Sequence, residues 1–237
     1  MTTTLLLLHG MGGTGALWNS WQQPLAQHWP GGWIAPDLAG HGQAAPLSEY
    51  TFHEMADAVA ATLEPTGSYA ILGHSLGGVL GLALAGRGLD VTAVVGLGIK
   101  VAWSADELAK AQSLAQRPVS WFDSRAEAAA RYLRVTGLTG LLDPTDPVVD
   151  AGLREQDGRW RLAMDPAAFG VGEPDMAALV AGATCPVTLA RGDGDAMMTA
   201  AQLAALVAEP VTLPGLGHNA HVEDSAACAA ALLPYLS

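Results

Sequence analysis

Short apolar runs alternate with segments of helical pattern in two parts of the chain, the first hundred residues and the stretch after Cys185. Four of these runs, at residues 5–8, 69–72, 187–190 and 211–213, have the length and composition of buried strands. Repeated strand and helix units favour a parallel sheet with helices on both faces. We therefore predict an α/β fold in which a mostly parallel central sheet of about six strands is flanked by helices.

The alternation stops across residues 100–183. Helical patterns at 104–116 and 124–135 are separated there by turns that contain proline and glycine, and each pattern opens with the Ser-x-x-Glu sequence of a capping box. This stretch is therefore predicted to be a helical cap, inserted into a core made of residues 1–99 and 184–237. The hydrophobic share of 50% in 237 residues is enough to bury the core of one domain.

The segment 73–78 reads Gly-His-Ser-Leu-Gly-Gly and lies between an apolar run and a helical pattern rich in small residues. Gly73 and Gly77 lack the Cβ atoms that would collide where a strand and a helix pack closely. Ser75 can therefore occupy a strained elbow with its hydroxyl exposed. Gly-x-Ser-x-Gly arises often by chance in a chain with 28 glycines, so the motif gains weight only from the segments that could serve it.

A nucleophilic serine needs hydrogen-bond donors where negative charge develops on the substrate oxygen. The first predicted strand runs into the glycine-rich loop His-Gly-Met-Gly-Gly, which can turn backbone amides inward. We assign the oxyanion hole to the amides of Met11 and Leu76.

Two further loops supply an acid and a base. The strand at 187–190 ends in a turn that carries Asp193 and Asp195, and open α/β sheets place functional groups at such carboxyl ends. A short strand near the C-terminus leads to His218, and His221 follows three residues later. Either aspartate could orient either histidine on this evidence alone.

The order Ser75, Asp195, His218 resembles the arrangement of the α/β-hydrolase superfamily and differs from the orders in chymotrypsin-like and subtilisin-like proteases. The resemblance covers most of the chain. It includes the His-Gly pair at 9–10 and the Pro-Asp-Leu-Ala-Gly-His-Gly segment at 36–42. Four ordered motifs at the family's spacing make this a specific signal.

The resemblance implies that Asp195 is the acid rather than Asp193, and that His218 is the base rather than His221. Other histidines in the family motifs are implied to be structural, with rings hydrogen-bonded to backbone: His9, His41 and His74.

The implied function is a serine hydrolase that cleaves carboxylic ester or related acyl bonds of a small molecule through an acyl-enzyme. Serine at the elbow disfavours haloalkane dehalogenases and epoxide hydrolases, relatives that carry aspartate there. Two alternatives stay open. One is a carbon-carbon bond hydrolase or lyase that acts on a carboxylate-bearing substrate with the same triad, and the other is a receptor that binds a small molecule without turnover.

The formal net charge of -12 argues against a nucleic acid or an acidic membrane surface as partner. Nine of the eleven Lys and Arg residues nevertheless fall between positions 100 and 161. Lys100 follows a predicted core strand, so it could bind a substrate carboxylate, as could Arg131 or Arg134. Ordinary solvated helix faces are the other interpretation of these charges.

Two tryptophans are candidates for the substrate pocket. Trp18 lies shortly after the predicted oxyanion loop, and Trp103 lies in the predicted cap. Large flat side chains suit an apolar pocket, but they serve equally well in helix packing.

Neither metal-ligand spacing nor a phosphate-binding loop occurs in the sequence, so no cofactor and no metal are expected. Cys185 and Cys228 are predicted to be free thiols in core elements. No apolar run reaches about 18 residues, and no basic residues precede the first leucines, so we expect a cytoplasmic protein without a membrane partner. A monomer is expected, with a homodimer as the alternative.

Overall fold

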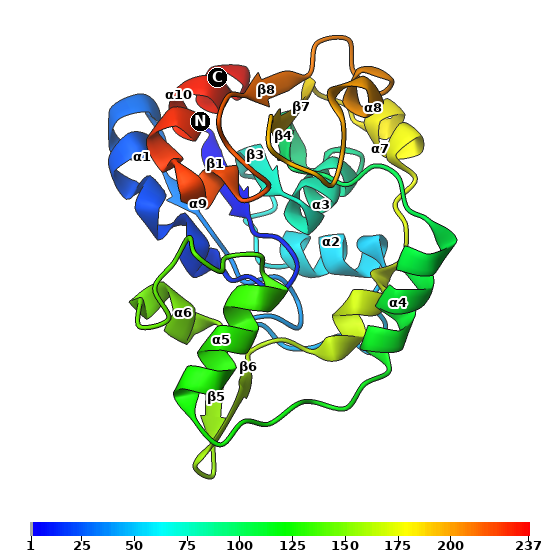
Figure 1. Ribbon diagram of the computed structural model, residues 1–237. Coiled ribbons are helices and arrows are strands. Elements are labelled where there is room, and N and C mark those ends of the chain that lie inside the picture. Colours follow the sequence, from blue (N-terminus) through cyan, green and yellow to red (C-terminus); the bar gives the residue numbers. More distant parts are fainter. Residues whose placement is uncertain (1) are drawn as a thin grey trace.

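Six parallel strands form the central sheet of the computed structural model, which describes residues 2–237 (Figure 1). Their spatial order is β2-β1-β3-β4-β7-β8. The strands are β1 (Thr4–Leu8), β2 (Trp33–Ile34), β3 (Ser68–His74), β4 (Asp90–Leu97), β7 (Val187–Gly192) and β8 (Val211–Leu213). The predicted parallel sheet of about six strands is confirmed.

Alternate residues of β1 pack into two different cores, because successive side chains of a strand point to opposite faces of the sheet. Leu6 and Leu8 belong to one core, whereas Leu5 and Leu7 belong to the other. All four side chains are fully buried. Helices therefore have to cover both faces, which explains why this strand is continuously apolar.

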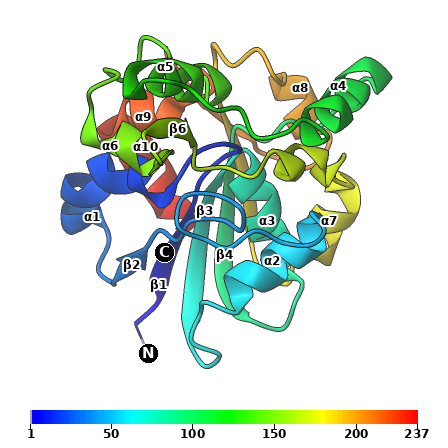
Figure 2. The same ribbon diagram turned by 90° about the horizontal axis from the view of Figure 1, so that it is seen from below.

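Figure 2 shows the two helical layers on either side of the sheet. The first layer consists of α2 (Phe52–Ala60), α3 (Leu76–Ala85), α7 (Met176–Gly182) and α8 (Ala200–Ala204). The second consists of η1 (Gly15–Trp21), α1 (Gln22–His28), α10 (Ser225–Leu232) and η3 (Leu233–Tyr235), with the short helix α9 (Ala220–Glu223) before α10. None of the helices within residues 2–237 has the length and apolar character needed to cross a membrane.

The stretch from residue 100 to residue 183, called the insertion below, joins β4 to β7. It contains α4 (Ala105–Ala115), α5 (Arg125–Val135), α6 (Pro147–Ala151), β5 (Leu153–Gln156), β6 (Arg159–Leu162), η2 (Pro166–Val171) and α7. Helices stand at both predicted helical patterns. Ser104 forms a complete capping box with Glu107, whereas Ser124 only accepts the amide of Glu127.

Besides the predicted helices, the insertion contains an antiparallel hairpin of β5 and β6, which was not predicted from the sequence. Its turn is Asp157-Gly158, and both residues have positive φ, at 52° and 76°. Asp-Gly is a preferred pair for such a tight turn. Each strand has only four residues, and the alternation of Trp160 and Leu162 with arginines in β6 is too short to predict a strand.

Candidate active site

Ser75 stands at a sharp turn between β3 and α3, with φ 50° and ψ -116°. Ser75 and Asp157 are the two non-glycine residues with positive φ in the described part of the chain. Such a conformation is strained for a residue with a Cβ atom and persists only where the surroundings impose it. Here the Ser75 amide donates to the Leu97 carbonyl of β4 at 2.8 Å, which ties the turn to the neighbouring strand.

Glycines on either side of Ser75 allow this turn to pack. A Cβ atom on Gly73 would lie 2.2 Å from the Gly77 carbonyl oxygen, and one on Gly77 would lie 2.4 Å from the Leu8 carbonyl oxygen. Both neighbours are backbone atoms that cannot move aside. The predicted role of these two glycines in a close strand-helix approach is therefore observed.

Asp195 and His218 come together from the loops after β7 and β8. His218 Nδ1 lies 2.9 Å from Asp195 Oδ2, and the Met197 amide donates to Oδ1 of the same carboxylate at 2.9 Å. Burial opposes the charge on Asp195, but the hydrogen bonds from His218 and Met197 and the nearby Arg191 hold its pKa below the ordinary value. The carboxylate therefore stays ionised while it accepts a hydrogen bond from the imidazole of His218.

The alternatives for the acid and the base lie elsewhere. Asp193 accepts the Gly215 amide at the surface, and it does not contact a histidine in the described structure. His221 is fully buried, and burial lowers its pKa to about 3. His221 therefore stays neutral and closed off from solvent, whereas His218 faces a cavity.

Ser75 and His218 line the same cavity, although no hydrogen bond joins their side chains within residues 2–237. In structures without substrate such contacts are often long and shorten in the substrate complex. Met11 and Leu76 line this cavity as well, and the backbone amide of neither donates a hydrogen bond to another described residue.

Two of the histidines implied to be structural, His9 and His74, are buried and bond to backbone groups. His9 accepts the Leu38 amide at Nε2 and donates from Nδ1 to the Gly10 carbonyl. His74 Nε2 donates to the His218 carbonyl at 2.9 Å, and its ring lies 4.1 Å from that of His221. These rings bond to backbone or pack on one another, as structural residues do.

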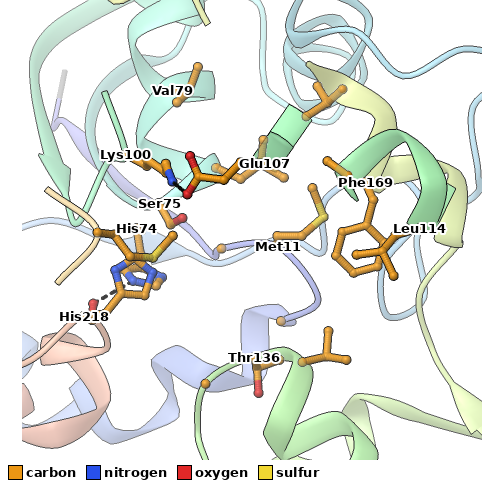
Figure 3. A pocket seen from close by; sticks show the side chains of 18 of the residues that line it. Met11, His74, Ser75, Val79, Lys100, Glu107, Leu114, Thr136, Phe169 and His218 are labelled. Carbon is orange, nitrogen blue, oxygen red and sulfur yellow. Dashed lines mark hydrogen bonds and ion pairs between the residues drawn. The ribbon is translucent and has the colours of Figure 1, made fainter. Parts of the chain in front are cut away.

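The cavity has a volume of about 440 Å³ and is lined in part by residues that follow the carboxyl ends of the strands (Figure 3). This volume is in the range of small-molecule sites. Apolar side chains form most of its wall, among them Met11, Leu17, Leu114, Val135 and Phe169. Loops after β1, β3, β4, β7 and β8 form its floor, and α4, α5 and η2 of the insertion face them.

Lys100 and Trp103 both line this cavity, as predicted residues near the substrate should. The Lys100 ammonium, however, forms an ion pair with Glu107 and lies 4.6 Å from the centre of the Trp103 ring (Figure 3). Its charge is therefore already compensated. Glu107 was identified from the sequence only as a capping residue, and no sequence signal connected it with Lys100.

The expectation that Trp18 reaches the pocket is wrong. Trp18 is 0% exposed and packs against Trp21 and His221 in the core that contains Leu5 and Leu7. Its neighbour Leu17 lines the cavity instead. In η1 consecutive side chains point in different directions, so one residue separates a wall position from a core position.

The described residues include no group of three or more His, Cys, Asp or Glu side chains that could hold a metal ion. Cys185 and Cys228 are both free thiols.

Comparison with known proteins places this geometry in context. The model of the alpha/beta hydrolase family matches residues 5–231. A lipase of Mycobacterium tuberculosis, LipV, is 32% identical over 171 residues, which is 68% of this chain and 62% of the lipase. The chain thus matches less than two thirds of the length of that curated relative.

Solved structures share the fold across nearly the whole chain. E-2-(acetamidomethylene)succinate hydrolase superposes with a TM-score of 0.81 at 22% identity, covering 98% of this chain and 91% of that one. The thioesterase domain from the curacin biosynthetic pathway gives a TM-score of 0.76 at 22% identity, with the same coverage.

Proposed function

The chain belongs to the alpha/beta hydrolase family, and from this we propose that it is a serine hydrolase that cleaves carboxylic ester or related acyl bonds of a small molecule. One observation carries the proposal. Ser75 is held at a strained turn and lines the same cavity as His218. The Nδ1 atom of His218 is hydrogen-bonded to the buried carboxylate of Asp195. Hydrolysis as the reaction class agrees with the family and with the lipase relative.

In the proposed mechanism, Asp195 accepts a hydrogen bond from the Nδ1–H of His218, which keeps that proton on Nδ1 and leaves Nε2 free to take the proton of the Ser75 hydroxyl. The Ser75 oxygen attacks the carbonyl carbon, and the carbonyl oxygen gains negative charge. The free amides of Met11 and Leu76 would stabilise that charge.

Collapse of the tetrahedral intermediate expels the alcohol, which takes the proton from His218, and the acyl group stays on Ser75. Water then gives a proton to His218 and attacks the acyl carbon. The second collapse releases the carboxylic acid and returns the proton to Ser75, so atoms and charges balance over the cycle.

The insertion is proposed to act as the cap that selects the substrate. Leu114 of α4, Val135 of α5 and Phe169 of η2 face Ser75 across the cavity. Their apolar side chains suit an acyl chain or an apolar leaving group, since ligand sites bury most of the ligand surface against such residues.

A carbon-carbon bond hydrolase for a carboxylate-bearing substrate is the second candidate, because the cavity is also lined by Lys110 and Arg134, two cations that have no ion-pair partner among residues 2–237. The structural relative named as a succinate hydrolase has a similar fold, at an identity that supports the fold alone.

Initial rates on p-nitrophenyl esters of increasing acyl length, for wild type and Ser75→Ala, test the proposal. We expect turnover in wild type and a loss of at least about a thousandfold in Ser75→Ala. Ser113→Ala is a matched control, because Ser113 is an exposed serine of α4 outside the cavity lining. Equal rates in wild type and Ser75→Ala would exclude the serine mechanism, and stoichiometric ligand binding without product release would favour a receptor.

A further inference from the structure

The Lys and Arg side chains of this acidic chain fall into two groups. Seven form an ion pair or donate a side-chain hydrogen bond within residues 2–237: Arg87, Lys100, Arg125, Arg154, Arg159, Arg161 and Arg191. The remaining four form neither: Lys110, Arg117, Arg131 and Arg134. The chain has 23 Asp and Glu residues, so a shortage of acidic residues does not explain why these four cations form no ion pair.

All four of these cations line two adjoining cavities. Lys110 and Arg134 line the cavity that contains Ser75, whereas Arg117 and Arg131 line a smaller one of about 90 Å³. The cavities share three lining residues, Leu114, Val135 and Phe169, which therefore form the partition between them.

Arg131 and Arg134 lie three positions apart on α5, so they are neighbours on one helix face. Like charges at this spacing destabilise a helix. A cation near the C-terminus of a helix is favoured by the helix dipole, and this accounts for Arg134 but not for Lys110 in the middle of α4. Self-repulsion of this kind is relieved when an anion binds.

Lys100 is not part of this group, although it lines the same cavity as Ser75 (Figure 3). Only 13% of its side chain is exposed, and Glu107 neutralises it. A substrate acid at Lys100 would have to displace Glu107, which also caps α4. Lys110 and Arg134 present no such competition.

We infer that Lys110, Arg134, Arg117 and Arg131 form an anion-binding site for a substrate that carries an acid group, a carboxylate or a phosphate, at the end of an apolar chain. This inference rests on the proposed function, because Ser75 takes the acyl carbon of the same substrate. Leu114, Val135 and Phe169 contact the apolar middle of the chain.

In the bound state the acid group contacts Lys110 and Arg134, and longer chains pass the partition to reach Arg117 and Arg131. Guanidinium groups match carboxylate and phosphate with paired hydrogen bonds. The positive patch also raises the rate at which anionic substrates reach a protein whose net charge would otherwise repel them.

Binding to the Ser75→Ala variant tests the site without turnover. We would titrate it calorimetrically with monomethyl suberate, which keeps one carboxylate, and with the neutral dimethyl ester. The half-ester is expected to bind about tenfold tighter, as a charge-assisted hydrogen bond predicts. Octyl phosphate against octanol is the second arm, which distinguishes phosphate from carboxylate as the preferred acid.

Adding Lys110→Gln and Arg134→Gln should reduce the preference for the half-ester to less than about twofold, and about 0.5 M salt should weaken it in the parent variant. Arg159→Gln is the matched control, because Arg159 is a cation of the insertion that pairs with Asp123 outside both cavities. It should leave the preference intact.

Replacing Arg117 and Arg131 with Gln tests the smaller cavity with the longer monomethyl sebacate. The loss of these two arginines should weaken the binding of monomethyl sebacate more than the binding of monomethyl suberate.

Three results would overturn the inference: equal affinity for charged and neutral esters, a preference that survives the loss of Lys110 and Arg134, or no binding of any of these ligands at millimolar concentration. Ser75-dependent turnover of neutral esters would leave the proposed function standing in each case. The two proposals therefore fail separately.

Discussion

Buried imidazoles should make this protein unusually sensitive to mild acid. His9 and His221 are 0% exposed, and burial, with neighbouring histidines as a smaller cause, lowers the pKa of each from 6.5 to about 3. Above pH 6.5 both rings are neutral in the folded and the unfolded chain. As the pH falls below 6.5, the unfolded chain binds protons that the folded chain cannot bind, so stability is lost down to the folded pKa.

The magnitude follows from these values. Below pH 6.5, each histidine lowers the free energy of unfolding by about 1.36 kcal/mol per pH unit. Between pH 6.5 and pH 5 this amounts to about 2 kcal/mol for each histidine and about 4 kcal/mol for the two together. This is a large part of the roughly 5–15 kcal/mol that stabilises a typical domain. His74 and His41 add to the effect in the same direction, because burial also lowers the pKa of each.

Urea unfolding followed by tryptophan fluorescence at pH 7, 6 and 5 measures this loss. His221→Phe keeps an aromatic ring at this position and removes one titrating group. No hydrogen bond is lost in this variant, because neither nitrogen of His221 has a hydrogen-bond partner in the described structure. This variant should therefore lose about 2 kcal/mol less than wild type between pH 6.5 and pH 5.

His28→Gln, at an exposed position, is the control and should keep the wild-type slope. A free energy of unfolding that is the same at pH 7 and pH 5, or a wild-type slope in His221→Phe, would refute the reasoning.

Two further outcomes are expected. Gly77→Ala should unfold the protein or lower its melting temperature strongly, because the new Cβ would lie 2.4 Å from the Leu8 carbonyl oxygen. Gly32→Ala is the control, because a Cβ there meets nothing within 4 Å. Similar melting temperatures for the two variants would contradict this packing. Asp195→Asn should fold normally and lose about 10⁴-fold in kcat on esters, because His218 would lose the carboxylate that fixes its tautomer; near-wild-type turnover would exclude Asp195 as the orienting acid.

The sequence by itself determined the parallel sheet and the groups at its carboxyl edge. The run Leu5 to Leu8 is apolar at every position, and only a strand buried on both faces requires that. Because the carboxyl ends of parallel strands meet at one edge, loops far apart in the chain could be expected to bring Ser75, Asp195 and His218 together. The structure brings Asp195 and His218 into contact and sets Ser75 in the same cavity.

Only the tertiary structure decided which side chains of the insertion face this edge. The strands of the β5–β6 hairpin are too short for their apolar alternation to predict them, and Trp18 points into the core because consecutive side chains of η1 point in different directions. Whether the charge of Lys100 is free or paired depends on Glu107, which lies seven residues further along the chain on α4. The local sequence does not specify how α4 packs.

The same holds for the four cations without partners. They belong to α4, to α5 and to the segment between them, and their convergence on two cavities follows from how α4 packs on η2 and α5 packs on the hairpin of β5 and β6. Strand order and glycine turns are written in local patterns, whereas the meeting of distant side chains depends on packing, which no local pattern encodes.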